Sequence, residues 1–126
     1  MPHKVLIVDD SKLARMAVIK ALLSLHPDWQ RVEASSAAEA LEQLKDGSID
    51  IALLDFNMPG KDGLALAAEL REAYPKVSVA VISANHQVEV VNRAQQAGAT
   101  FLAKPITAKS LGEFLDLAVK RSQGAG

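Results

Sequence analysis

The sequence predicts an α/β domain in which helices cover both faces of a five-stranded parallel sheet. The chain has 126 residues, which favours a single domain. Short β-type runs alternate with helical segments five times, and such alternation is typical of an open, mostly parallel, doubly wound sheet. Three of the runs are nearly continuous in apolar residues, as central parallel strands must be when helices bury both of their faces.

The expected strands are recognised by their apolar and β-branched residues. The first, third and fourth runs are the most apolar, so we place them in the middle of the sheet. The second run is shorter and more polar, which favours a position at an edge. In chain order the runs cover residues 5–8, 32–34, 51–54, 77–82 and 100–103.

Helical segments fill the gaps between these runs, and most of them begin or end at residues that favour helix termini. Ser11 is a candidate N-cap for the first helix and Thr107 for the last. Gly47 follows the second helix as a C-terminal stop, the third helix ends before Pro75, and the fourth ends at Gly98. The expected helices cover residues 11–25, 36–46, 63–74, 85–97 and 107–121.

Composition and charge exclude several classes of protein. The formal net charge of −1 gives no overall attraction to nucleic acid or membrane, and the absence of cysteine excludes disulfides and thiolate chemistry. His3, His26 and His86 form no metal-ligand pattern and are expected to be solvated, whereas Trp29 is expected to pack. The chain lacks a signal-peptide layout and any apolar stretch of membrane-spanning length, so we expect a cytoplasmic protein.

Charged and hydroxyl residues follow four of the expected strands. The first strand ends in Asp9 and Asp10, the third in Asp55, the fourth in Ser83 and the fifth in Lys104. Because the carboxyl ends of parallel strands meet at one edge, these side chains should converge there. Ligands of open α/β sheets bind at that edge.

This set of groups suits phosphoryl transfer. Carboxylates about 5 Å apart repel by roughly 3 kcal/mol at an effective dielectric of about 20, and a divalent cation relieves the repulsion. An all-oxygen ligand set suits Mg²⁺. A carboxylate can attack phosphorus to form an aspartyl phosphate, and a cation, a lysine and a hydroxyl can stabilise the charge that develops.

At these residues the chain resembles the response-regulator receiver domains of two-component signalling, particularly stand-alone receivers of the chemotaxis type. The resemblance covers residues 4 to about 121 and implies a flavodoxin-like strand order of 2-1-3-4-5 in a single receiver domain, residues 1–126. It rests on four motifs in the expected order, namely Val8-Asp9-Asp10-Ser11, Asp55-Phe56-Asn57-Met58-Pro59-Gly60 with Asp62-Gly63, Ser83-Ala84 and Lys104-Pro105.

The resemblance implies a role for each acidic residue. Asp55 would be the phosphoacceptor and would also contact Mg²⁺. Asp10 would be the main metal ligand, with Asp9 acting largely through water. The backbone carbonyl of Asn57 would complete the protein ligands.

The resemblance also implies how phosphorylation is read. Ser83 would donate a hydrogen bond to one phosphoryl oxygen and Lys104 would pair with another. Phe101 matches the position of an aromatic switch, although a plain core aromatic is an equally good interpretation of this residue. Movement of Phe101 would alter the surface of helix four, strand five and helix five. A cis peptide bond is expected between Lys104 and Pro105.

The implied function is phosphorylation-dependent signalling rather than turnover of a substrate. The domain would catalyse only its own phosphorylation and dephosphorylation, with Mg²⁺ as cofactor. Its partners would be a histidine kinase or phosphotransfer protein and a downstream protein target, with no direct contact to nucleic acid or membrane.

Two alternatives remain open from the residues. A phosphatase of the haloacid-dehalogenase type also uses an aspartate nucleophile with Mg²⁺, a hydroxyl and a lysine. That class needs a second aspartate two residues after the nucleophile, where this chain has Asn57. A binding domain of the same fold that is not phosphorylated, or that holds a flavin, is the other alternative.

Overall fold

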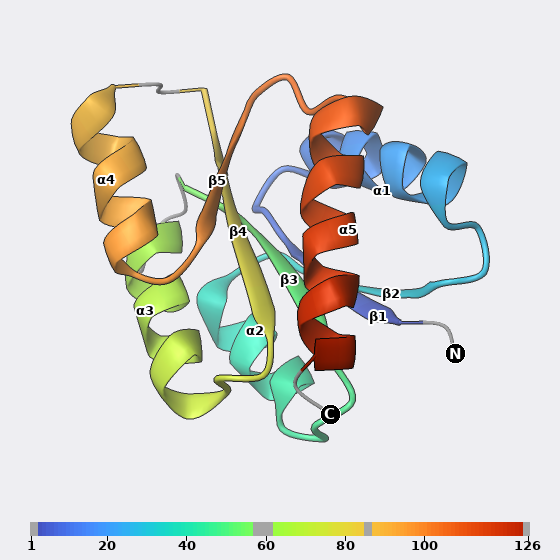
Figure 1. Ribbon diagram of the computed structural model, residues 1–126, viewed down its shortest axis with the longest axis horizontal. Helices are drawn as coiled ribbons and strands as arrows, with labels where there is room; N and C mark the ends of the chain where they lie inside the picture. Colours follow the sequence, from blue (N-terminus) through green and yellow to red (C-terminus); the bar gives the residue numbers. More distant parts are fainter. Residues whose placement is uncertain (1–2, 57–61, 85–86, 125–126) are drawn as a thin grey trace.

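The computed structural model describes residues 3–56, 62–84 and 87–124, and it has the predicted α/β architecture (Figure 1). The five strands form one sheet in the order β2-β1-β3-β4-β5, and every neighbouring pair is parallel. The strands are β1 (Lys4–Val8), β2 (Gln30–Ala34), β3 (Ile51–Asp55), β4 (Ser78–Ser83) and β5 (Thr100–Ala103).

Helices cover both faces of the sheet and divide the core into two layers. Figure 1 shows α1 and α5 on one face and α2, α3 and α4 on the other, in agreement with the two clusters of buried residues. The helices are α1 (Lys12–Leu25), α2 (Ala37–Leu44), α3 (Gly63–Ala73), α4 (Val88–Gln96) and α5 (Ala108–Gly124).

Alternation along β1 explains why the central strands must be apolar throughout. Val5 and Ile7 pack into the layer under α1 and α5, while Leu6 and Val8 pack into the layer under α2, α3 and α4. Successive side chains of a strand point to opposite faces, so a strand covered on both faces has no solvated side. The prediction that the first, third and fourth runs lie centrally is therefore confirmed.

The edge strand β2 is longer than its apolar residues indicate. It begins at Gln30, two residues before the predicted start, because Lys4 and Val5 of β1 pair with Gln30 and Arg31. Backbone pairing extends the strand here although both of its first side chains are exposed. A prediction based on hydrophobicity therefore omits Gln30 and Arg31, because both are polar residues at a sheet edge.

Side-chain caps fix the starts of several helices. Ser11 Oγ accepts a hydrogen bond from the N–H of Ala14, and Thr107 Oγ1 accepts one from Ser110, which confirms both predicted caps. Gly47 and Gly98 end α2 and α4 with φ of 74° and 78°, a conformation that strongly favours glycine. The first described residue of α4 is Val88, and the expected start at 85 falls outside the described residues.

The expectation that His3 and His26 are solvated is wrong. Both are half-buried against Trp29, which is itself buried and therefore packs as predicted. The His26 ring stacks on the indole with centroids 3.8 Å apart, and the His3 ring meets it edge-on at 4.8 Å. The contact could not be predicted because His3 is far from His26 and Trp29 in the sequence. His86 lies outside the described residues. Within the described part of the chain, no helix is long and apolar enough to cross a membrane.

Candidate functional site

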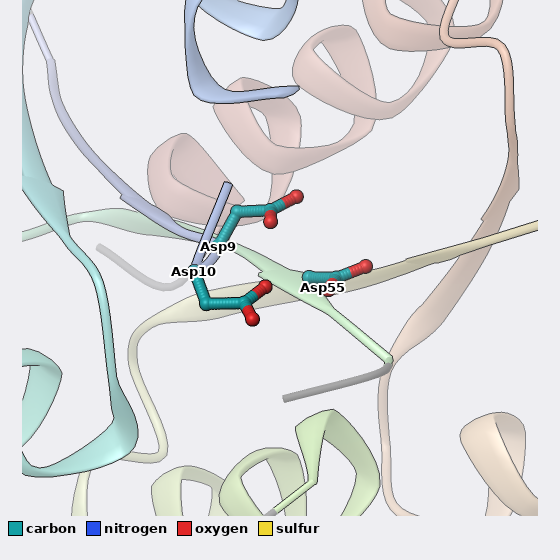
Figure 2. Close-up of side chains that lie close together, drawn as sticks. All are labelled: Asp9, Asp10 and Asp55. Carbon is teal, nitrogen blue, oxygen red and sulfur yellow. The ribbon is translucent and has the colours of Figure 1, made fainter. Parts of the chain in front are cut away.

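Three carboxylates meet at the carboxyl ends of two neighbouring strands. Asp9 and Asp10 follow β1, and Asp55 is the last residue of β3. Figure 2 shows the three side chains side by side at this edge, and one oxygen from each lies within 4.8 Å of the others. The register of the parallel pair, with Val8 opposite Leu54, brings these residues to the same level of the sheet. The predicted acidic cluster is therefore present.

Burial differs among the three acids. Asp55 and Asp9 are only 4% and 6% exposed, whereas Asp10 is exposed to solvent. A buried carboxylate is costly unless it is paired and hydrogen-bonded. The two buried acids therefore require partners that the surrounding elements must supply.

Lys104 supplies the positive charge. Its Nζ donates a hydrogen bond to Asp55 Oδ1 at 2.9 Å and lies 3.8 Å from Asp9 Oδ2. Partial burial disfavours the charged amine, but the hydrogen bond to Asp55 and the charges of the three acids outweigh it, and the pKa of Lys104 is raised. Lys104 thus remains an ammonium ion between the two buried carboxylates.

Backbone contacts place Lys104 at this edge. Its N–H donates a hydrogen bond to the carbonyl of Ser83 at 2.9 Å, which ties the end of β5 to the end of β4. The peptide bond between Lys104 and Pro105 is cis, as predicted.

Asp9 is held on its backbone and on its side chain. Its N–H donates to the carbonyl of Ala34 at 3.1 Å, and its Oδ1 accepts a hydrogen bond from the N–H of Ser11 at 2.9 Å. Burial, together with the charges of Asp55 and Asp10, raises the pKa of Asp9, although the Ser11 N–H and Lys104 act in the opposite direction. Negative charge at this position is therefore under-compensated by the protein alone.

Backbone packing fixes the end of β3. The N–H of Phe56 donates to the carbonyl of Ile82, and the N–H of Gly63 donates to the carbonyl of Phe56 at 3.0 Å. A Cβ atom on Gly63 would overlap the carbonyl oxygen of Asp55 and lie 2.9 Å from its carbonyl carbon. Only glycine allows the first residue of α3 to approach the Asp55 backbone so closely.

The remaining predicted site residues lie around this cluster. Ser83 is 1% exposed at the end of β4, and Phe101 in β5 is half-buried against the core layer under α2, α3 and α4. Asn57 lies outside the described residues. The structure therefore brings Asp9, Asp10, Asp55 and Lys104 into one cluster.

Sequence reasoning missed Arg15, which contacts the backbone of Asp9, and Glu33, which contacts Arg15. Arg15 in α1 donates from Nη1 to the carbonyl of Asp9 at 2.6 Å and from Nε to Glu33 Oε1 at 2.9 Å. An arginine in the first turn of α1 and a glutamate in the strand beside β1 are the signals that could have indicated them. Neither signal is specific without the strand register.

A largely apolar cavity of about 410 Å³ opens beside the cluster. Asp9 and Lys104 form its polar part, and side chains of α1 and of the segment after β5 form its wall, including Val18, Pro105 and Ile106. A cavity of about 510 Å³ at the other end of the sheet is lined by His3, Asp50, Lys76 and Arg121 among others, and by none of the predicted site residues. Of these two cavities, the one of about 410 Å³ is lined by residues of the acidic cluster's surroundings that the structure describes, namely Asp9 and Lys104.

The donor set fits a hard divalent cation. All candidate ligand atoms are carboxylate oxygens, two of the three acids are buried, and Asp10 is open to solvent. Mg²⁺ prefers such oxygens and keeps several of its own waters, for which the exposed side leaves room. The cluster could therefore hold Mg²⁺.

Known proteins resemble this chain in sequence. Residues 5–116 match the family model of the response regulator receiver domain. The chain is 34% identical to the chemotaxis protein CheY of Bacillus subtilis, over 92% of this chain and 97% of that protein. It is 43% identical to the probable transcriptional regulatory protein NarL of Mycobacterium tuberculosis, over 84% of this chain but half of that protein.

A solved structure agrees with the sequence comparisons. The signal receiver domain of NarL from Mycobacterium tuberculosis superposes with a TM-score of 0.82 at 39% identity, covering 94% of this chain and 97% of that domain. The chain therefore resembles the whole of CheY and the receiver portion of NarL.

Proposed function

The chain belongs to the response regulator receiver domain family, which acts in phosphorylation-dependent two-component signalling, and we propose that Asp55 is its phosphoacceptor. Receiver domains are signalling domains rather than enzymes, and they interact with histidine kinases and downstream targets. The observation that carries the assignment is the hydrogen bond from Lys104 Nζ to Asp55 Oδ1 inside the acidic cluster. Asp55 is the member of that cluster that this lysine contacts most closely.

The proposed transfer is an in-line displacement at phosphorus. A carboxylate oxygen of Asp55 attacks the phosphoryl group of a phosphohistidine, a P–O bond forms, and the P–N bond breaks. The electron pair of the broken bond stays on the imidazole nitrogen of the donor. Lys104 and the hydroxyl of Ser83 stabilise charge on the transferred phosphoryl oxygens, so the protein contributes mainly position and electrostatics.

We assign the metal ligands to Asp10 and Asp55 directly and to Asp9 largely through water. When bound, Mg²⁺ would neutralise charge on the carboxylates and on phosphoryl oxygens. The backbone carbonyl of Asn57 is a further proposed ligand that rests on the family resemblance alone. The under-compensated charge of Asp9 supports the assignment, because burial already disfavours its ionised form.

The proposed output is a change in the surface formed by α4, β5 and α5. Phe101 lies on β5, three residues before Lys104, and is half-buried. A shift of its ring would therefore change the shape of this surface. The donor would be a histidine kinase or phosphotransfer protein, and the receiver of the signal another protein. The domain would also catalyse loss of its own phosphoryl group by admitting a water molecule to the phosphorus.

Acetyl phosphate with Mg²⁺ provides the direct test. Intact-mass analysis should show one added phosphoryl group on the wild type and none on Asp55→Asn, because an amide is not a nucleophile here. Asp28→Asn changes an exposed aspartate in the loop before β2 and serves as the matched control. A persistent adduct on Asp55→Asn would refute the phosphoacceptor assignment.

The same experiment separates the alternatives. A binding domain that is not phosphorylated would gain no mass under any condition. A phosphatase of the haloacid-dehalogenase type would release phosphate in large excess over protein, whereas a receiver forms one adduct per chain.

A further inference from the structure

Arg15 ties the end of β1 to the neighbouring strand β2. Its Nη1 donates a hydrogen bond to the backbone carbonyl of Asp9 at 2.6 Å, and its Nε donates one to Oε1 of Glu33 at 2.9 Å. Only 14% of the Arg15 side chain is exposed. A guanidinium group is a planar fork with fixed donor directions, so the two contacts hold it in one orientation.

This contact restrains the peptide unit that joins Asp9 to Asp10. The carbonyl of Asp9 and the amide nitrogen of Asp10 share one rigid plane, so fixing the first fixes the second. The other polar groups of Asp9 are bound as well, its N–H by Ala34 and its Oδ1 by Ser11. Arg15 therefore completes the restraint of the residue that directly precedes Asp10.

Asp10 depends on this restraint more than its neighbours do. It is exposed, and no hydrogen bond among the described residues involves its carboxylate. Asp9 and Asp55, by contrast, each have a hydrogen-bonded carboxylate oxygen. The peptide plane that Arg15 holds consequently fixes the amide nitrogen and the Cα atom from which the Asp10 side chain extends.

We propose that Arg15, oriented by Glu33, is a positioning residue that aims the carboxylates of Asp9 and Asp10 at a shared divalent cation with Asp55. The inference rests on the proposed function, because it takes the acidic cluster to be the cation site. A positioning role and an explanation based on charge alone predict opposite changes in cation affinity when the Arg15 guanidinium is removed. A guanidinium near a cation site repels the cation, so its removal should strengthen binding if only charge mattered, whereas loss of positioning weakens binding.

Isothermal titration calorimetry with Mg²⁺ on the unphosphorylated full chain tests this. Arg15→Met keeps much of the apolar stem and removes the fork, and it should raise the Mg²⁺ dissociation constant roughly tenfold or more, as expected when a group orienting a metal ligand is lost. Glu33→Ala should weaken binding in the same direction. Glu33→Gln should recover much of that loss, because its amide oxygen can still accept the Nε–H.

Two reference variants complete the design. Asp10→Asn reports on the cation site itself and should weaken Mg²⁺ binding. Lys45→Met removes a cation from the exposed pair that Lys45, directly after α2, forms with Glu42, and it should leave binding as in the wild type. Circular dichroism establishes that each variant is folded, and the Glu33 pair carries the test if Arg15→Met is not.

The outcomes separate this inference from the proposed function. Unchanged or tighter binding in Arg15→Met, with Asp10→Asn weakened, would overturn the positioning role and leave the cation site standing. Weaker binding in Glu33→Gln equal to that in Glu33→Ala would also overturn it, since charge rather than orientation would then explain both. Wild-type affinity in Asp10→Asn would show that Asp10 is not a ligand of the cation, and this inference would then fall.

Discussion

Lys104 Nζ lies 2.9 Å from Asp55 Oδ1, although the two residues are 49 positions apart in the chain and their strands are not neighbours. β4 separates β3 from β5, so the lysine side chain must reach over the end of β4 to make this contact. The bond to the Ser83 carbonyl fixes the backbone from which the side chain reaches. The cluster is therefore assembled by the sheet as a whole.

Removal of this ammonium should destabilise the protein in the absence of Mg²⁺. Loss of one partner of a buried ion pair leaves an uncompensated charge. Because the Lys104 side chain is 36% exposed, water offsets part of the effect. We expect Lys104→Met to lower the free energy of unfolding by about 1–2 kcal/mol, measured by urea denaturation.

A double-mutant cycle isolates the pair itself. Lys104→Met should cost clearly less in an Asp55→Asn background, since the carboxylate that it compensates most closely is then absent. Equal costs in the two backgrounds would show that the lysine stabilises the protein through packing or through Asp9, and not through Asp55.

Neutralisation of Asp9 should have the opposite effect on the metal-free protein. Burial raises the pKa of Asp9, so the folded state binds this proton more tightly than the unfolded state does. Ionisation at neutral pH therefore destabilises the fold, and stability from this group is lost as pH rises through the raised pKa. Asp9→Asn should unfold at a higher temperature than the wild type at pH 7, and its amide oxygen can still accept the Ser11 N–H.

Two comparisons check this explanation. The advantage of Asp9→Asn should shrink as pH falls toward the ordinary carboxyl pKa of 3.8, where the wild-type side chain is increasingly protonated in both states. Asp28→Asn, which changes an exposed acid far from the cluster, should show little difference at either pH. An advantage that is independent of pH would mean that packing, not charge, is responsible.

Mg²⁺ should raise the melting temperature of the wild type through binding to the native state. A tenfold weaker affinity lowers this stabilisation by about 1.4 kcal/mol when the site is near saturation in the wild type. Asp10→Asn should therefore lose most of the Mg²⁺-dependent shift in a thermal denaturation experiment. The same shift in Asp10→Asn and wild type would exclude a metal role for Asp10.

Particular residues show how far the sequence could predict this protein. Asp9, Asp55 and Lys104 each follow an apolar run, and the alternation of strands and helices alone indicates that they meet at one edge. Their distances from one another depend on the register of β1, β3 and β5, which no single segment encodes.

Other features were beyond the reach of the sequence for definite physical reasons. The contacts of Arg15 with Glu33 and with the Asp9 carbonyl require β2 to lie beside β1 in a particular register, with Ile7 opposite Glu33. The rings of His3 and His26 meet Trp29 only because the loop after α1 folds against the start of β1. The sequence around an isolated polar residue does not indicate which distant residue it will contact.

Gly63 offers a prediction that separates steric from conformational effects of glycine. A Cβ there would overlap the Asp55 carbonyl oxygen and crowd the Cα of Phe56 at 3.0 Å, and both obstacles are backbone atoms that cannot rotate away. Either α3 or the end of β3 must shift to accept alanine. We expect Gly63→Ala to lower the free energy of unfolding by about 1–3 kcal/mol, the usual cost of overpacking, and to slow phosphorylation of Asp55.

Gly112 is the matched control, because it also lies in a helix but has space around it. A Cβ there would make ordinary contacts with the two methyl groups of Leu25 at 3.6 and 3.7 Å. Gly112→Ala should therefore raise the free energy of unfolding by up to about 1 kcal/mol through helix propensity and leave phosphorylation unchanged. Urea denaturation and intact-mass phosphorylation on the two variants give four values. If Gly63→Ala matched Gly112→Ala in both stability and phosphorylation, the close approach of α3 to the Asp55 backbone would have no part in holding the phosphoacceptor.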